Sequence, residues 1–329
     1  MDRRSFTKTA VATVLGGVVA GNTFGVSKAS DIAESSAPYK SKFAPHFGML
    51  KASMTKAGID VKKDFVSQLQ FFHDCGFRAL EDNGMMSRPV EVQEAIAKKM
   101  EQLGWEMGVF CAHTEWKLSS YSGNRLDTKI KKANGVIVRN PKEVREMLVA
   151  RMEKAIEVGK RVNAKWCTVV PGLEDPTLEP EYQFANVVEN LRYMCDVCAK
   201  TGIVMVLEPL NIFNHWSLYL KRIPQAYAIC KAVNSPYCKI LDDMYHQQIT
   251  EGNLIPNFDA ARSEIPYVQV GDVPGRKEPT TGEINYKRIF QHLWDTGYRG
   301  IIGMEHGQSD TSIEGDKKLL KAYRSVDVA

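Results

Sequence analysis

The chain has 329 residues, of which 44% are hydrophobic and 25% are charged. This composition is that of a globular protein with enough apolar side chains for one large domain, so it indicates neither a disordered chain nor a repeat array. The formal net charge of +4 is spread over the whole length. Its closest basic runs, Lys62-Lys63 and Lys129-Ile130-Lys131-Lys132, are too short to follow a phosphate backbone, which argues against a nucleic-acid partner.

The N-terminal residues have the features of an export signal. Arg3-Arg4-Ser5-Phe6-Thr7-Lys8 precedes an apolar, small-residue run from Ala10 to Ala20. This pattern resembles a twin-arginine signal, with cleavage expected near Ala29. A membrane anchor is the alternative, but the run is shorter than the roughly 20 apolar residues that a span requires. We therefore expect a signal peptide over 1–29, a linker over 30–40 and a single domain over 41–329, exported to the periplasm without stable membrane insertion after cleavage.

The chain has 7 cysteines, and their positions show no compact disulfide framework. Cys195 and Cys198 have CxxC spacing, yet they continue an apolar stripe at helical spacing with Val187, Leu191 and Met194. We expect both to pack in the core. A disulfide and a metal or redox site are the alternatives.

Beyond Tyr39, short apolar runs alternate with longer amphipathic stretches, which is the pattern of parallel strands joined by crossover helices. The expected strands are 43–50, 79–82, 105–113, 166–171, 203–209, 238–243, 267–272 and 300–305. Eight such units favour an α/β fold of the (β/α)8 barrel type over an open doubly wound sheet. No Gly-x-Gly-x-x-Gly turn follows the first strand, so a dinucleotide site lacks its fingerprint.

The longest connection between expected strands and helices runs from Thr114 to Arg139. Within it, Ser119-Ser120-Tyr121-Ser122-Gly123-Asn124 is rich in small and polar residues, which predicts a surface loop over the barrel mouth. Such a loop is a candidate lid.

Polar residues close four of the expected strands, at the barrel end where active sites of this fold lie. They are Glu208, Asp243, Gln269 and Glu305. An ionised carboxylate at the end of a buried strand is costly unless a cation or hydrogen bonds compensate it, so three converging carboxylates indicate a cation. Carboxylate and amide oxygens are hard donors, which favours Mg²⁺ or Mn²⁺, with Co²⁺ or Zn²⁺ as alternatives. Ion pairs with barrel lysines or arginines are the competing explanation.

A divalent cation at this position would polarise a substrate carbonyl and an adjacent hydroxyl, which eases removal of the proton on carbon. Glu208 and Glu305, on opposite sides of that carbon, could serve as base and acid. The resulting enediolate could be reprotonated to an isomer or an epimer, or could expel a β-leaving group. The residues alone leave isomerase, epimerase and lyase open.

The same residues lie in segments that resemble the hydroxypyruvate isomerase branch of the xylose isomerase-like TIM-barrel superfamily. The best match begins at Gln269-Val270-Gly271-Asp272-Val273-Pro274-Gly275-Arg276 and ends at Gly282-Glu283-Ile284-Asn285-Tyr286. It is similar to the family pattern (I/V)Q(x)(A/G)DxPGRxEPxTGEINY. Three strand ends are also similar to the family: Leu207-Glu208-Pro209-Leu210-Asn211, Asp243-Met244-Tyr245-His246-Gln247-Gln248 and Gly303-Met304-Glu305.

This resemblance implies a divalent metal bound by Glu208, Asp243, Gln269 and Glu305, with Glu208 and Glu305 as proton donor and acceptor. It also implies substrate contacts at His246, which would hydrogen-bond an oxygen, and at Arg276, which would face a carboxylate or hydroxyl. We add Asn211 and His113 as candidate substrate-binding residues. Core roles for the two histidines and a loop ion pair of Arg276 with Glu278 or Glu283 are the alternatives.

The substrate is expected to be a small carbohydrate or hydroxy-keto acid. Asn214-His215-Trp216 differs from the usual family continuation, and hydroxypyruvate is an intracellular metabolite whereas this chain carries an export signal. We therefore hypothesise a free sugar, keto-sugar or glycoside-derived unit. Trp116 and Trp216, just beyond strand ends, could stack on the apolar side of a sugar ring.

Two further hypotheses compete with the isomerase. An endonuclease IV-like enzyme would need a histidine-rich trinuclear zinc site, whereas the strand ends here offer carboxylates. A non-catalytic sugar-binding barrel would not need both candidate acid–base glutamates. The sequence does not indicate an oligomeric state.

Overall fold

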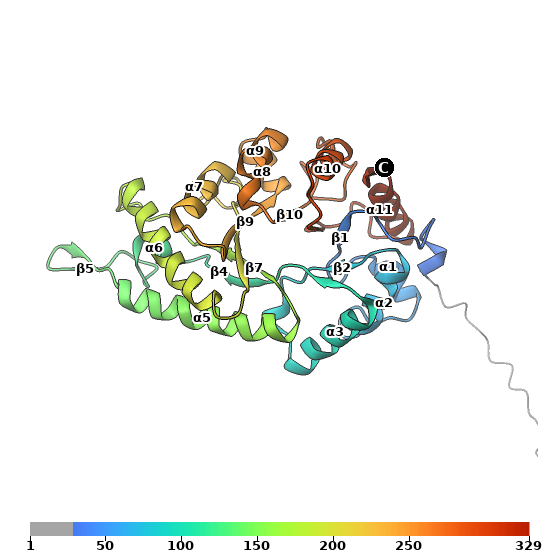
Figure 1. Cartoon of the computed structure of the whole chain (residues 1–329), viewed down its shortest axis with the longest axis horizontal. Coiled ribbons are helices and arrows are strands. Elements are labelled where there is room, and N and C mark those ends of the chain that lie inside the picture. Colours follow the sequence, from blue (N-terminus) through green and yellow to red (C-terminus); the bar gives the residue numbers. More distant parts are fainter. Residues whose placement is uncertain (1–28, 329) are drawn as a thin grey trace, which may run out of the picture.

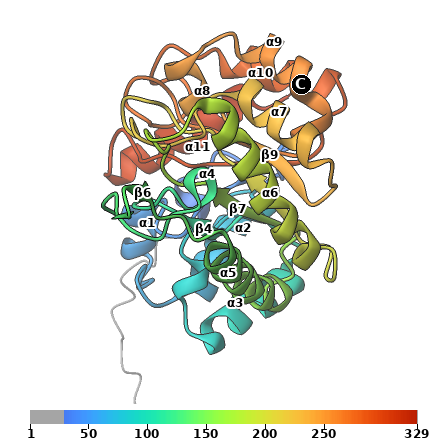
Figure 2. The same ribbon diagram turned by 90° about the vertical axis from the view of Figure 1, so that its left-hand side faces the viewer.

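A curled parallel sheet surrounded by helices forms the centre of the molecule in this computed structural model, which describes residues 29–328 (Figures 1 and 2). Its strand order is β1-β11-β10-β9-β8-β7-β4. The strands are β1 (Lys42–Ala44), β4 (Cys111–Thr114), β7 (Trp166–Val170), β8 (Val204–Leu207), β9 (Cys238–Asp243), β10 (Tyr267–Gln269) and β11 (Ile301–Gly303). This arrangement confirms the expected α/β barrel class.

A separate parallel pair, β2 (Ala79–Leu80) and β3 (Glu106–Met107), lies beside β1. The backbone N–H of Glu81 donates to the carbonyl of Pro45 at 3.2 Å, which joins this pair to the β1 side. The expected strand 105–113 is therefore divided between β3 and β4. The hydroxyl of Tyr267 accepts from the N–H of Val109 at 3.3 Å, so this side chain takes a backbone group that a continuous strand would pair.

The helices lie outside the strands and bury one apolar face each. They are α1 (Lys51–Lys56), α2 (Phe65–Asp74), α3 (Val90–Leu103), α4 (Ser120–Gly123), α5 (Pro141–Arg161), α6 (Pro180–Cys198), α7 (Ile223–Val233), α8 (Met244–Thr250), α9 (Leu254–Ala261), α10 (Tyr286–Asp295) and α11 (Ile313–Val326). In α5, Pro141 begins the helix and Val144, Leu148 and Met152 are buried at intervals of four residues. Helix α5 packs against β4 and β7, and α6 packs against α5 and β8 (Figure 2).

Two sequence predictions are wrong in their details. The first strand ends at Ala44 and not at residue 50, because side-chain amides of Gln68 and Gln308 accept from the N–H groups of Gly48 and Leu50, both at 3.0 Å. These bonds hold residues 47–50 in a turn.

Residues 119–124 are likewise not a surface loop. They contain α4, whose four residues are all buried. The side-chain amide of Asn190 in α6 donates to the carbonyl of Tyr121 at 3.0 Å, and the hydroxyl of Ser122 donates to the carbonyl of Leu173 at 2.6 Å. Such partners allow this segment to be buried. The exposed part of the connection is the hairpin of β5 (Lys132–Ala133) and β6 (Val136–Ile137), which projects from one end of the molecule (Figure 1).

The predicted linker packs against the barrel. The short helix η1 (Ala29–Asp31) buries Ala29, and the ring of Tyr39 stacks on Phe77 with centroids 4.9 Å apart. The predicted signal peptide and its membrane-anchor alternative lie, apart from Ala29, outside the described residues. Within residues 29–328, no helix is both long and apolar enough to cross a membrane.

The cysteines are all free thiols. Cys195 and Cys198 are buried in α6, which confirms their expected packing in the core.

Adjacent aspartates at the end of β9 are both buried but have different surroundings. Asp243 lies at the strand end and accepts from a helix N–H, whereas neither carboxylate oxygen of Asp242 has a hydrogen-bond partner among the described residues. Burial, with a smaller contribution from the charge of Asp243, raises the pKa of Asp242 to about 8. Asp242 is therefore held as the neutral acid near neutral pH.

We predict that Asp242→Asn reduces the loss of stability with rising pH. The native state keeps this proton up to about pH 8. The unfolded chain releases it near pH 4, so the free energy of unfolding falls between these values, by up to about 1.4 kcal/mol per pH unit. Urea unfolding over this range should give a shallower slope for the variant than for the wild type. The exposed Asp196→Asn serves as control, and equal slopes for all three proteins would contradict the prediction.

Candidate active site

The register of four neighbouring strands, β8 to β11, brings the predicted polar residues to one end of the barrel. Gln269 is paired with Asp243 on one side and with Gly303 on the other. Glu305 follows Gly303 by two residues, and Glu208 follows the end of β8. Glu208, Asp243 and Gln269 are buried, and the side chain of Glu305 is 24% exposed. The four expected ligands therefore share the mouth.

The carboxylate of Asp243 has one oxygen that caps a helix and one that faces the other charged side chains of the site. Oδ1 accepts from the N–H of Tyr245 at 2.9 Å and so caps α8. Oδ2 lies 3.5 Å from Nε2 of His246, which in turn is 3.8 Å from Oε1 of Glu208. Potential ligand atoms of these three residues all lie within 4.8 Å of one another.

The hydrogen bonds of His246 indicate its tautomer. Its Nδ1 faces two N–H donors of Asn211, the backbone N at 3.3 Å and Nδ2 at 2.7 Å. The amide of Asn211 is oriented because its Oδ1 accepts from the N–H groups of Phe213 and Asn214. Since Nδ1 accepts, the proton of the neutral ring lies on Nε2. The Nε2–H group of His246 therefore faces the carboxylates, and in this tautomer Nε2 has no lone pair for a metal.

The guanidinium of Arg276 joins two of the protein's own carboxylates, whereas the family resemblance implies only a contact with the substrate. Its Nη2 donates to Oδ2 of Asp243 at 2.8 Å and to Oε2 of Glu305 at 3.0 Å. It also lies over the ring of Tyr245, 4.8 Å from the centroid. The alternative loop ion pairs are not formed, because Glu278 accepts from Ser309 and Glu283 from Gln248.

A turn organised by Asp272 holds this arginine. The carboxylate of Asp272 accepts from the N–H groups of Val273, Gly282 and Ile284. Its carbonyl accepts from the N–H of Arg276 at 2.7 Å. The side chain of Arg276 is thereby directed from a loop onto the strand ends.

Burial and mutual repulsion raise the proton affinities of the two candidate acid–base groups. Burial, then the neighbouring charges of Glu305 and Asp243, raises the pKa of Glu208 well above its usual value. Burial also raises the pKa of Glu305 to about 7, against the lowering effect of Arg276. Burial lowers the pKa of His246 to about 4, so its ring is neutral near pH 7. A carboxyl group that titrates near neutrality, as Glu305 does here, suits proton transfer.

Sequence reasoning missed Glu81, which is buried at the end of β2. Its Oε2 accepts from Nε2 of Gln269 at 3.2 Å and from the hydroxyl of Tyr267 at 3.1 Å. These bonds orient the amide of Gln269, whose buried Oε1 has no hydrogen-bond partner among the described residues. The rule that identified the other strand ends applies equally to Glu81. Asn83 was also missed, and its amide donates to Oε1 of Glu305 at 2.7 Å.

His113 is the one predicted site residue that the structure does not bring to this group. Its Nδ1 lies 2.8 Å from the hydroxyl of Tyr121 in α4, and its Nε2 contacts the guanidinium of Arg151 in α5. A register shift between Cys111 and His113 accompanies this orientation toward the helices. Asn211, by contrast, is beside the site through His246.

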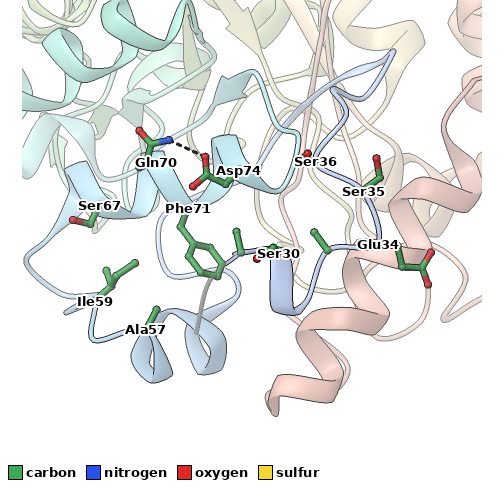
Figure 3. A pocket seen from close by; sticks show the side chains of 12 residues that line it. Ser30, Glu34, Ser35, Ser36, Ala57, Ile59, Ser67, Gln70, Phe71 and Asp74 are labelled. Carbon is green, nitrogen blue, oxygen red and sulfur yellow. Dashed lines mark hydrogen bonds between the residues drawn. The ribbon is translucent and has the colours of Figure 1, made fainter. Parts of the chain in front are cut away.

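Two cavities of the structure differ in whether they adjoin the candidate site. One of about 430 Å³ adjoins the site and is lined by residues that include His46, Asn83, Arg276 and Glu305. A larger one of about 810 Å³ lies between the N-terminal segment and α1 and α2, where Gln70 donates to Asp74 at 2.8 Å (Figure 3). The second cavity contains none of the predicted site residues.

Comparison with known proteins gives one family match. The family model described as "Xylose isomerase-like TIM barrel" matches residues 69–324. Hydroxypyruvate isomerase of Escherichia coli is 28% identical over 279 residues, which are 84% of this chain and 100% of that protein. The 2-oxo-tetronate isomerase of Cupriavidus necator is 34% identical over 122 residues, 37% of this chain. The chain spans only about half the length of some relatives. It covers 47% of the Cupriavidus necator protein and 57% of a putative hydroxypyruvate isomerase from Xenopus laevis.

Solved structures show the same fold at low identity. An AP endonuclease of family 2 from Brucella melitensis superposes with a TM-score of 0.65 at 21% identity, over 84% of this chain and 96% of that one. The 3-keto-D-glucoside 4-epimerase of E. coli superposes with a TM-score of 0.67 at 18% identity, over 87% of this chain and 100% of that one. At this low identity, these two matches show the barrel fold alone.

We predict that Gly303→Ala destabilises the protein by about 1–3 kcal/mol, because a Cβ would overcrowd the barrel interior. That atom would overlap the carboxylate of Glu81 and lie 2.9 Å from Cγ of Gln269. Urea unfolding measures the change. The control is Gly84→Ala, whose Cβ would meet its nearest neighbour at 3.4 Å. Equal free energies of unfolding for the two variants would show that the interior tolerates the methyl group.

Proposed function

The chain belongs to the xylose isomerase-like TIM barrel family, and on this basis we propose that it is a metal-dependent isomerase of a hydroxy-carbonyl or sugar substrate. The observation that carries the proposal is the convergence of Glu208 and Glu305, both with raised pKa, on one mouth with the unpartnered amide oxygen of Gln269. Perturbed carboxylates in a cleft are a common feature of catalytic sites.

The residues present suit a divalent cation. A buried oxygen such as Oε1 of Gln269 ordinarily has a partner, and a cation would supply one. Oδ2 of Asp243 and the carboxylate of Glu208 face the same space. We propose that these groups and Glu305 hold Mg²⁺ or Mn²⁺, the cations that all-oxygen ligand sets favour, with Co²⁺ or Zn²⁺ as the alternatives. When bound, the cation would polarise the substrate carbonyl and stabilise charge on its oxygen.

The protein's own side chains would move the protons. Glu305 and Glu208 would act as base and acid on the substrate, one removing the proton from the carbon next to the carbonyl and the other supplying a proton. Nε2 of His246 would donate a hydrogen bond to a substrate oxygen. Arg276 would hold Asp243 and Glu305 in position and face a substrate hydroxyl or carboxylate.

For the substrate we propose a keto-sugar or a glycoside-derived unit. The E. coli relative is named for hydroxypyruvate, and the E. coli structural neighbour for a 3-keto-D-glucoside. The proposed periplasmic location, which depends on residues 1–29 alone, favours a sugar over an intracellular metabolite. Reprotonation on the same carbon would make the enzyme an epimerase, and loss of a β-substituent would make it a lyase.

The test is metal content followed by proton exchange. We expect the purified protein to contain about one Mn²⁺ or Mg²⁺ per chain and, in deuterated buffer, to introduce deuterium beside the carbonyl of a ketose or 3-keto-glycoside. Glu305→Gln should lower the exchange rate by about 100-fold or more. The exposed Glu283→Gln is the matched control. Metal-free protein without exchange on any ketose, aldose or 3-keto-glycoside would refute the proposal in favour of a sugar-binding barrel.

A second prediction concerns Glu81 as a positioning residue for Gln269. Glu81→Ala should weaken Mn²⁺ binding by about 10–100-fold, because the amide would lose the acceptor that orients it. Glu81→Gln retains a carbonyl acceptor and should weaken binding much less. Calorimetric titration of variants shown to be folded by circular dichroism measures both. Equal losses in the two variants would contradict the positioning role.

A further inference from the structure

Large aromatic side chains are exposed on two loops at the barrel mouth. Trp116, after β4, is 47% exposed, and Phe213 and Trp216, after β8, are 74% and 77% exposed. Large apolar side chains exposed close to a candidate active site can mark a ligand-binding surface.

A series of ring contacts connects these loops to the active site. The indole of Trp116 stacks on the imidazole of His215, with centroids 5.4 Å apart and planes inclined by 30°. His215 meets His246 edge to face, with centroids 5.6 Å apart. His246 in turn faces Glu208 and Asp243. His246 therefore lies between the stacked pair of Trp116 and His215 and the carboxylates of the site.

The loop that carries His215 is held in place by the site itself. The carboxamide of Asn211 accepts from the N–H groups of Phe213 and Asn214, at 3.1 and 3.0 Å, and the hydroxyl of Tyr245 donates to the side chain of Asn214. A bridge between Leu173 and Leu218 secures the end of the loop. The aromatic groups are thus presented on a preorganised surface, which lowers the entropic cost of binding.

The chemistry of this surface fits a sugar ring. Flat aromatic faces bind the apolar faces of pyranoses, and their edges leave the sugar hydroxyls free to be hydrated. Burial and the charge of Arg276 lower the pKa of His215, so its ring is uncharged at neutral pH and stacks as an apolar plate. A triose-sized substrate that reacts at Glu305 would not need such a surface.

We propose that Trp116 and His215, flanked by Phe213 and Trp216, form an outer subsite for the second pyranose ring of a disaccharide-type keto-glycoside. The inference rests on the proposed function and specifies its substrate class. The keto ring would lie between Glu208 and Glu305, and the second ring would contact the stacked pair at the surface.

The experiment compares a one-ring with a two-ring substrate, methyl 3-keto-glucopyranoside and 3-ketolactose, by proton exchange in deuterated buffer. Trp116→Ala should lower the ratio of kcat/KM for the two-ring over the one-ring substrate about tenfold, mainly through KM. Trp116→Phe should retain most of the ratio. The control is Tyr182→Ala, which removes an aromatic residue 65% exposed in α6. An unchanged ratio in Trp116→Ala would overturn the subsite.

Binding of unoxidised lactose, followed by tryptophan fluorescence, separates the subsite from the proposed reaction. If no keto-sugar exchanges protons but lactose quenches the wild type and not Trp116→Ala, the proposed function fails and the subsite stands. If lactose does not quench the wild type, the subsite is wrong. It is also wrong if Phe213→Ala converts a dimer to a monomer in light scattering without changing lactose binding, because the surface would then be a subunit interface.

Discussion

The compensation of buried negative charge at one end of the barrel is the constraint on which the rest of the site depends. Glu208, Asp243 and Glu305 approach one another where water is largely excluded, and Arg276 is the cation that binds two of them. One guanidinium does not neutralise three carboxylates, so part of the charge is relieved by the raised pKa values of the two glutamates. The same excess of charge is what a divalent cation would relieve. Catalytic proton transfer and metal binding thus have one electrostatic origin in this proposal.

Hydrogen bonds inside the barrel connect the mouth to neighbouring polar groups. Glu81, Tyr267 and Gln269 form a hydrogen-bonded group in which one oxygen of Gln269 is left for the site. Gly303 leaves the space that the carboxylate of Glu81 fills. The hydroxyl of Tyr267 also interrupts the strand between β3 and β4 by accepting from Val109. Irregular strand pairing on this side of the barrel is therefore a consequence of filling its centre with polar groups.

Two loops at the barrel mouth have different roles in the proposed binding of substrate. The turn held by Asp272 directs Arg276 inward onto the reacting carboxylates. The loop after β8 extends outward, with Asn211 fixing both its own backbone and the tautomer of His246. Asn211 thus connects the loop after β8 to His246. The same hydrogen bonds would therefore align the proposed outer subsite with the catalytic centre. A substrate that reaches both sites would contact the aromatic rings of the outer subsite at one end and the charged side chains of the catalytic centre at the other.

By itself, the sequence determined the barrel class and the convergence of Glu208, Asp243, Gln269 and Glu305 at one end of it, because hydrophobic alternation and strand-end polarity are local patterns. Only the tertiary structure decided which way His113 points, that residues 119–124 are buried, and that Glu81 orients Gln269. Those outcomes depend on partners far apart in the chain: Arg151 for His113, α6 for α4, and Tyr267 for Glu81. Local periodicity carries no information about such pairings, which exist only once the strands have closed around their polar centre.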